Sequence, residues 1–407
     1  MAVESERVPL LSNNPMPETD FRLAAWQLEL KDNPFGDDVS RLVGAEREVS
    51  VTVNMDTSLR PKVLDACGMT CVFCHNEGTP VASDNKNRII FLGSVGISGR
   101  VSVFSEANGV DFLPGKMMPD ENFKSSLAVL KEGLGLNEMH MTGGEPTLHP
   151  ELPQLISVAA DQGYSVKMTS NGENGVRMIP ACAEAGLKKV NFSIFGTTPN
   201  ELAAVQHARY RNPNLAAAKI KALHRSIATA VEYNVEVGAN IVMSDISHAD
   251  RVRRVLDEFE PKLSLRILPD LDLGAESHFA IYKFLADLGA KAMDASVDAG
   301  SSNARVRYQL PDGREVYFKQ IRPARMPETC GSCELNNSDD CKEGYYGVRL
   351  YTDQVGDYKV GVCLQRMDLT MPIDEFIGSS VYNDVRKMRE KEYEQLSNYY
   401  NNRGKDS

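Results

Sequence analysis

The sequence predicts an α/β protein with a parallel sheet, followed by a smaller C-terminal region that carries cysteines. After residue 60, short apolar or β-branched runs alternate with amphipathic stretches of helical period. Six such runs separated by helices predict parallel strands joined by helical crossovers. Polar or glycine-rich loops follow several runs, which fits this fold because ligands gather at the carboxyl ends of parallel strands. Past residue 325 the composition changes and cysteines return, so we expect a second region to begin there.

Residues 1–55 form the expected N-terminal extension. Its first 20 residues are polar and proline-containing and are predicted to be disordered. A helix is expected at Phe21–Leu30 and a strand at Val49–Val53. The extension is expected to cap an edge of the main domain, and a separate partner-binding module is the alternative.

The main domain is expected over residues 56–275. The predicted strands are the short runs rich in apolar or β-branched residues: Pro61–Ala66, Glu138–Met141, Ser165–Thr169, Lys189–Phe195, Val235–Met243 and Ser264–Leu268. The predicted helices are longer stretches with apolar residues at helical spacing: Asn122–Glu132, Leu152–Gln162, Leu215–Tyr233 and Ala249–Phe259. Arg88–Ser94 and Arg100–Ser105 flank a glycine-rich turn, so an inserted β-hairpin is expected at about residues 86–108, as a lid or an edge ornament.

A connecting segment is expected at residues 276–325. Glu276–Ala290 has helical period. Arg305–Leu310 and Glu315–Ile321 are strand-like and flank a Pro-Asp-Gly-Arg sequence, which is a strong turn signal. We therefore expect a helix followed by a β-hairpin. The C-terminal region, residues 326–407, is expected to end in a charged helix that wraps the surface.

Composition and charge exclude some classes of protein. Lys plus Arg number 45 against 56 Asp plus Glu, and the net charge of −11 argues against a protein that grips a nucleic acid backbone. No apolar run reaches the length of a membrane span, and the start of the chain has no signal-peptide core. Seven of the eight cysteines fall in two groups, with Cys182 alone between them, and this clustering is typical of metal ligation in a reducing compartment. We expect a cytoplasmic protein that binds neither membrane nor nucleic acid.

The first cysteine group is Cys67, Cys71 and Cys74, at C-x3-C-x2-C spacing on one loop. Three thiolates so placed can hold three corners of a [4Fe-4S] cubane and leave the fourth iron open to a substrate or cofactor. A zinc site and buried free thiols are the alternatives. Structural zinc takes four closed ligands, and the nearest fourth donor, His75, directly follows Cys74 and is badly placed to close a tetrahedron.

The second group is Cys330, Cys333, Cys341 and Cys363. Its spacing suits a zinc ribbon or an auxiliary [4Fe-4S] cluster, and by itself leaves both open. If Cys341 is a ligand, all four irons of such a cluster have protein partners, and the cluster would relay an electron or brace the region. If Cys341 is a surface thiol, one iron stays open to substrate.

A second motif accompanies the first cysteine group: Thr142-Gly143-Gly144-Glu145-Pro146 follows a predicted strand. Together they resemble the radical SAM superfamily. The resemblance implies an open (β/α)6 partial barrel and a [4Fe-4S] cluster whose open iron binds S-adenosylmethionine (SAM). Reductive cleavage of SAM would yield a 5'-deoxyadenosyl radical that takes hydrogen from a substrate, with flavodoxin or ferredoxin as reductant.

Further matches resemble the MoaA-like branch, the GTP 3',8-cyclases, and relatives with twitch or SPASM extensions: Cys71-Val-Phe-Cys74-His-Asn-Glu-Gly78, Thr169-Ser-Asn-Gly172, Asn191-Phe-Ser193 and the late cysteine group. The resemblance favours a second, auxiliary [4Fe-4S] cluster. It also implies roles for single residues. The implied SAM contacts are the Phe73 backbone at adenine, Gly143, Gly144 and Glu145 at the methionyl amine, Ser193 at the carboxylate or ribose, and Thr169 and Asn171 on the rim.

Departures from the cyclases bear on the substrate. Arg60 matches an arginine that the cyclases use on substrate, but His140 stands where they have a second arginine. Their lysine is absent from Val237–Asn240, and Glu334–Asn337 replaces the arginines after the C-x2-C pair. A triphosphate needs several cationic partners, so these changes argue against GTP.

The sequence therefore predicts a radical SAM enzyme that acts on a small molecule, with Arg60 and His140 as substrate residues. A nucleoside, a nucleotide or a natural-product precursor is expected, with cyclisation, carbon-carbon bond formation or rearrangement as the outcome. The alternatives are a SPASM-type peptide-modifying enzyme, a true GTP 3',8-cyclase and a non-enzymatic iron-sulfur or zinc scaffold.

Overall fold

The computed structural model describes residues 37–71 and 115–403, apart from short gaps at 207, 260, 323, 338–340, 342–343, 346, 354 and 365. Several expectations lie outside these residues. They are the disordered start, the helix at Phe21–Leu30, the hairpin at about 86–108, and the site residues Phe73 and Cys74.

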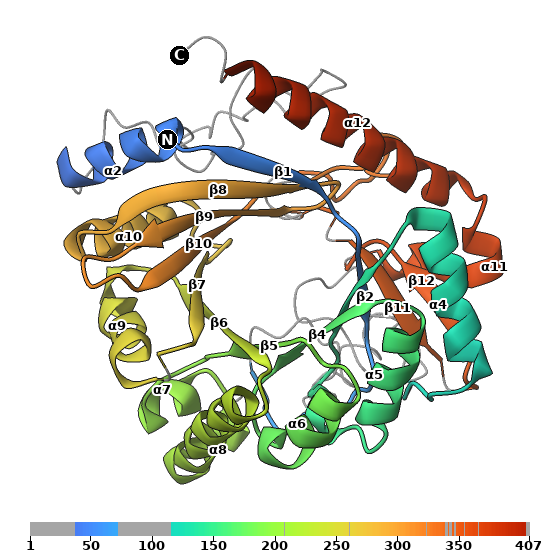
Figure 1. Ribbon diagram of the computed structural model, residues 1–407, viewed down its shortest axis with the longest axis horizontal. Coiled ribbons are helices and arrows are strands. Elements are labelled where there is room, and N and C mark those ends of the chain that lie inside the picture. The colour runs from blue at the N-terminus through green and yellow to red at the C-terminus, as the bar shows by residue number, and fades with distance from the viewer. Residues whose placement is uncertain are drawn as a thin grey trace, which may run out of the picture.

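The centre of the molecule is a run of six parallel strands in chain order, β2 to β7. Their bounds are Ser58–Pro61, Glu138–Met141, Ser165–Ser170, Lys189–Ser193, Glu236–Met243 and Ser264–Pro269. Figure 1 shows this sheet curving into a ring with the helices outside it. The predicted α/β class with a (β/α)6 partial barrel is confirmed.

Helices cover the outer face of these strands. The helices of the barrel and its edge are α2 Asp37–Glu48, α4 Glu121–Leu134, α5 Leu152–Asp161, α6 Gly175–Glu184, α7 Pro199–Ala204, α8 Pro213–Glu232, α9 Ala249–Glu258 and α10 Ala275–Asp287. Short 3-10 turns lie at Pro146–Leu148, Ala208–Tyr210, Ile246–His248 and Met367–Leu369. Residues alternate along β4, with Val166, Met168 and Ser170 buried and Lys167 and Thr169 half-buried. The apolar core therefore lies between sheet and helices, and the inner face of the ring is polar.

Three further strands extend the sheet beyond β7. They are β8 Lys291–Ala299, β9 Asn303–Gln309 and β10 Glu315–Ile321. The predicted hairpin is present as β9 and β10, and β10 pairs with β7 in parallel. Strand β8 was not predicted, and it links β9 to β1, Val51–Met55, which forms the sheet edge.

At the opposite edge the C-terminal strands join the same sheet. Strand β11, Val348–Thr352, pairs in parallel with β2, and β12, Tyr358–Gly361, and β13, Met371–Pro372, follow. Consecutive strands β1 and β2 therefore lie at well-separated places in the strand order. The bend between them carries the chain from the edge strand β1 to β2, which lies between β3 and β11 (Figure 1).

Two elements differ from the sequence expectation. The first strand, expected at Pro61–Ala66, lies at Ser58–Pro61. The apolar run after it is buried, but its backbone bonds to the loop after β3 instead of continuing the ladder. The terminal helix is two helices, α11 Ile373–Phe376 and α12 Ser380–Arg403, because Gly378 adopts a left-handed conformation between them. None of the helices in the described ranges is both long and apolar enough to cross a membrane.

Candidate active site

The glycine motif after β3 lies directly against the loop that carries the first cysteines. The Gly144 N–H donates to Leu64 O (2.9 Å), and the Glu145 N–H donates to Ala66 O (2.8 Å). A Cβ on Gly144 would stand 2.2 Å from Ala66 O, and one on Gly143 would stand 2.5 Å from Leu64 O. Both glycines are thus required by close backbone approach, and the motif sets the position of the cysteine loop.

Glu145 has a structural bonding pattern. Its buried carboxylate accepts hydrogen bonds from Thr147 Oγ1 (2.6 Å), Ser170 Oγ (2.7 Å) and the Asn171 N–H (2.6 Å). Burial raises the pKa of this carboxyl, and these donors oppose the rise. The carboxylate ties the end of β3 to the end of β4.

Two side-chain amides reach the sulfurs of the first cysteine group. Asn171 Nδ2 lies 3.7 Å from Cys67 Sγ, and Gln206 Nε2 lies 3.5 Å from Cys71 Sγ. Gln206 Oε1 also accepts from the Thr70 N–H at 2.7 Å. N–H donors to cysteine sulfur stabilise thiolate and raise the potential of a bound cluster. Asn171 is one of the predicted rim residues. Gln206 was not predicted, because no local sequence pattern around residue 206 marks it as a partner of a loop far away in the chain.

Glu173 holds the same loop from the other side. Its carboxylate accepts from the Gly68 N–H (2.9 Å) and pairs with Lys219 on α8 (3.0 Å). A Cβ on Gly68 would stand 1.9 Å from Glu173 Oε2, so the glycine lets the loop close over this carboxylate. Glu173 was not predicted as a site residue. Its place directly after the Ser-Asn-Gly loop is the one sequence feature that could have indicated this role.

The remaining SAM candidates lie on the inner face of the ring. Thr169 and Ser193 are half-buried near the carboxyl ends of β4 and β5. Asn240 lies opposite Ser193 on β6. These positions lie at the carboxyl ends of parallel strands, where parallel sheets bind ligands.

Arg60 and His140 come together on neighbouring strands β2 and β3. His140 Nε2 lies 3.4 Å from Glu138 Oε2, and Lys167 pairs with the same carboxylate at 2.7 Å. Burial lowers the pKa of His140 to about 4, with Arg60 and Lys167 acting in the same direction. Hydrogen bonds from His140 and Lys167 lower the pKa of Glu138 to about 2. His140 is therefore neutral at physiological pH and can donate or accept a hydrogen bond, but cannot replace a cationic arginine.

The four C-terminal cysteines line one small cavity. Cys330, Cys333, Cys341 and Cys363 stand around it with Met326, Leu335, Tyr345 and Val362. Burial raises the pKa of the Cys330 thiol to about 11. Arg366 Nη1 donates to Cys333 Sγ at 3.5 Å. Four sulfurs around one largely apolar cavity fit a [4Fe-4S] cluster. In the parts of the chain that the structure describes, no three His, Cys, Asp or Glu side chains are grouped closely enough for a single metal ion.

Part of the chain matches a family model, and curated proteins and solved structures are similar to it. Residues 62–258 match the family model described as the radical SAM superfamily. A probable GTP 3',8-cyclase of Sulfolobus acidocaldarius is 27% identical over 338 residues, covering 81% of this chain and 88% of that protein. Another, of Thermoplasma volcanium, is 22% identical over 326 residues, covering 76% and 81%. Among solved structures, Streptococcus suis SuiB bound to its precursor peptide is 12% identical with a TM-score of 0.45, covering 86% of this chain and 70% of that one.

Proposed function

The chain is a radical SAM enzyme similar to the GTP 3',8-cyclases, and from this premise we propose that it abstracts hydrogen from a small molecule other than GTP. A nucleoside, a nucleotide with fewer phosphates or a natural-product precursor is the expected substrate. Cyclisation, carbon-carbon bond formation or rearrangement would follow.

One observation carries the proposal. The glycine motif pairs with the backbone of the cysteine loop through Gly144 and Glu145, while Asn171 and Gln206 direct N–H donors at two of its sulfurs. Cys67, Cys71 and Cys74 would hold a [4Fe-4S] cluster there. When bound, the cluster and SAM supply a carbon radical that removes hydrogen from substrate. The chain's own part is to fix the loop, to place Ser193 and Thr169 on the face next to it, and to exclude water.

The charges on the inner face support a substrate other than GTP. Lys167 pairs with Glu138, Lys189 with Glu236, and Arg266 donates to Asn191. These cations are already partnered within the barrel, so they are poorly available to a triphosphate, which needs several cationic contacts. The cyclase relatives keep GTP 3',8-cyclisation as the second candidate.

The second cysteine group is proposed to hold an auxiliary [4Fe-4S] cluster with Cys341 as its fourth ligand. The support is that all four thiols border one cavity, with Cys341 among them. A cluster with four protein ligands has no open iron, so its role would be electron relay or bracing. A flavodoxin or ferredoxin in a reducing cytoplasm is the proposed reductant.

The test is anaerobic reconstitution followed by iron counting and an assay of reductant-dependent 5'-deoxyadenosine. Two cubanes give about eight irons per chain. We expect Cys67→Ala to abolish deoxyadenosine formation and Cys341→Ser to lower the iron count while leaving the SAM cluster signal. Four irons with one zinc would contradict the auxiliary cluster. Absence of deoxyadenosine in the wild type would contradict the enzyme, and a cyclised GTP product would favour the second candidate.

A further inference from the structure

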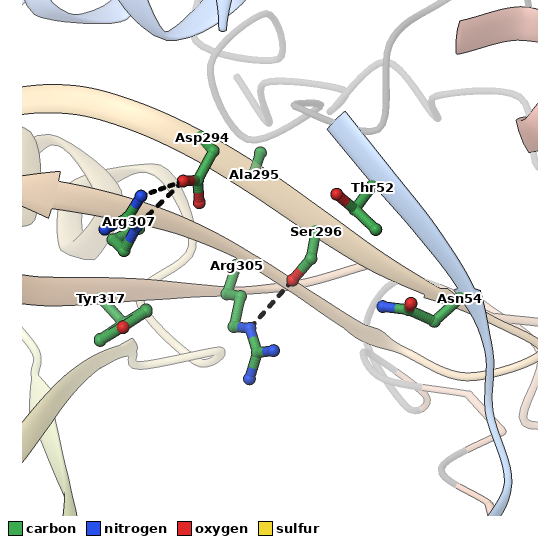
Figure 2. A pocket seen from close by; sticks show the side chains of 8 residues that line it. All are labelled: Thr52, Asn54, Asp294, Ala295, Ser296, Arg305, Arg307 and Tyr317. Carbon is green, nitrogen blue, oxygen red and sulfur yellow. Dashed lines mark hydrogen bonds and ion pairs between the residues drawn. The ribbon is translucent and has the colours of Figure 1, made fainter. Parts of the chain in front are cut away.

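A polar cavity lies on the inner face of the sheet extension, away from both cysteine groups. It has a volume of about 280 Å³ and is bordered by β1, β8, β9 and β10. Figure 2 shows its charged and polar side chains, with Arg305 and Tyr317 on neighbouring strands and Asn54 at the far end. Thr52 and Ser296 are opposite each other in the sheet and add two hydroxyls. The lining thus offers guanidinium, hydroxyl and amide groups in one place.

The two arginines of this cavity differ in their charge balance. Arg307 pairs with Asp294 across to β8 and with Glu315 on β10, so its charge is neutralised. A bulge in β8 between Ala292 and Asp294 brings Asp294 opposite Arg307. Arg305, by contrast, has no ion pair within the described residues. Its Nε donates to Ser296 Oγ at 2.9 Å, which orients the guanidinium.

The two terminal NH2 groups of the Arg305 guanidinium are the donors that we assign to a ligand, since the Nε–H is bonded to Ser296. In Figure 2 the guanidinium extends away from the strands beyond Ser296. Two N–H groups held in this fork match the two oxygens of a carboxylate or phosphate. Arg307 is already paired with two carboxylates, so the cavity has one cationic side chain, Arg305, without a carboxylate partner among the described residues. It is suited to one oxyanion and not to a polyphosphate.

The cavity and the proposed SAM face lie along one row of paired residues that crosses neighbouring strands of the sheet. Ser193 lies opposite Asn240, Asn240 opposite Arg266, and Arg266 opposite Tyr317 of the cavity. Neighbouring strands are about 4.8 Å apart, so this row spans roughly 14 Å. In Figure 1, β5 and β9 lie on opposite sides of the ring. A molecule that is anchored in the cavity and extends along this row would therefore approach Ser193.

We propose that this cavity is the substrate-anchoring subsite, and that the substrate is a small hydroxylated molecule with one carboxylate or phosphate held by Arg305. This inference rests on the proposed function, since it names the substrate class for that enzyme. Ser296 orients Arg305 for the oxyanion. The Tyr317 hydroxyl donates to Glu315 and the Asn54 amide donates to Asp298, so the oxygens of these two side chains, with the Thr52 hydroxyl, accept from substrate hydroxyls. Ligand pockets range over about 300–1,000 Å³, so a cavity at the lower limit excludes a peptide segment or a whole nucleoside triphosphate.

The test is calorimetric titration of the reconstituted full chain with ribose 5-phosphate, gluconate and, as the neutral counterpart, ribose. We expect at least one of the two anions to bind more tightly than ribose, and its identity distinguishes phosphate from carboxylate recognition. Arg305→Gln should weaken that binding roughly tenfold or more, and Arg305→Lys should weaken it less, because the lysine keeps the charge but loses the fork.

Arg225→Gln is the matched control, because Arg225 is an exposed arginine on the outer helix α8. It removes the same charge and should leave binding unchanged. The inference is overturned if neither anion binds more tightly than ribose, or if Arg305→Gln binds both anions as well as Arg225→Gln does. Deoxyadenosine formation by the wild-type preparation is measured separately, so a failed subsite and a failed enzyme give different results.

Discussion

At the scale of single residues, neighbours decide what each side chain can do. Burial lowers the pKa of His140 and keeps the ring neutral, and the neighbouring Arg60 and Lys167 act in the same direction. The Glu145 carboxylate accepts hydrogen bonds from Ser170 and Asn171 next to the cysteine loop. The Gln206 amide bonds to Thr70 and Cys71 on that loop. Arg305 and Arg307 are two residues apart on one strand, yet only Arg307 is neutralised by carboxylates. Residue type alone would have given the two arginines the same role.

The lowered pKa of His140 predicts a pH dependence of stability. The folded state takes up the His140 proton only near pH 4, whereas the unfolded chain takes it up near the ordinary value of 6.5. Stability from this residue is therefore complete above about pH 6.5 and is lost as the pH falls toward 4. His140→Gln should therefore reduce the fall in the free energy of unfolding between pH 6.5 and pH 4 by on the order of 2 kcal/mol.

The measurement is urea unfolding between pH 4 and 8, with an NMR titration of the imidazole. His224→Gln serves as the comparison, because His224 lies on the outer face and its pKa is lowered mainly by burial. An imidazole of His140 that titrates at its usual pH would show that the ring is not desolvated in the barrel.

At the scale of elements, the last helix has a more specific role than covering a surface. Asp384 on α12 is buried, and its carboxylate accepts from the Glu328 N–H (3.1 Å) and the Thr329 N–H (2.6 Å). These two amides begin the turn that leads into Cys330. Because a single side chain caps this turn from a distant helix, α12 positions the second cysteine group.

Asp384→Ala should therefore loosen the C-terminal cysteine loop. Two amide donors lose their acceptor, which costs about 1–3 kcal/mol. We expect reconstituted iron at the C-terminal site to fall while the SAM cluster signal is retained. Asp374→Ala, an exposed carboxylate on α11, should change neither quantity. Equal iron content in the two variants would mean that the cap does not support the site.

At the scale of the whole molecule, α12 joins parts of the sheet that are far apart in sequence. Arg389 donates to Leu134 O at the end of α4 and to Asp56 O at the bend between β1 and β2. Arg322, just past β10, forms a two-bond pair with Glu392. One helix thus holds together the end of α4, the bend after the edge strand β1 and the end of β10.

Breaking the Arg322–Glu392 pair should destabilise the whole fold. The side chains are 6% and 14% exposed, so a single Arg322→Leu or Glu392→Leu change leaves a buried charge without its partner. Each single change is expected to cost about 3–5 kcal/mol, and the double change clearly less than the sum of the two. Urea unfolding measures this cycle.

The control cycle uses Arg386 and Glu390, an exposed pair on the same helix, for which the coupling should be far smaller because solvent screens the two charges. Additive single effects at Arg322 and Glu392 would show that the two residues do not act as a pair.

The sequence alone determined the parallel six-stranded core and the superfamily. Both depend on local signals. The period of the apolar residues shows which face of an element is buried, and closely spaced cysteines and glycines can be recognised without knowledge of the tertiary structure. The helix α2 and the strand β8 were not predicted, because α2 is mostly polar in sequence and apolar and polar residues alternate only weakly along β8. The first strand was predicted too late in the chain, because the buried apolar residues continue beyond the hydrogen-bonded strand β2.

Only the tertiary structure decided which distant segments meet. It joined β8–β10 and β11–β13 to the barrel in one sheet, and it brought Gln206 to Cys71. It also paired Arg307 with carboxylates, whereas in the described part of the chain the Arg305 side chain bonds to the Ser296 hydroxyl and forms no ion pair. The physical reason is that such pairings are set by hydrogen bonds and charges between residues far apart in the chain. No local pattern around either partner records them.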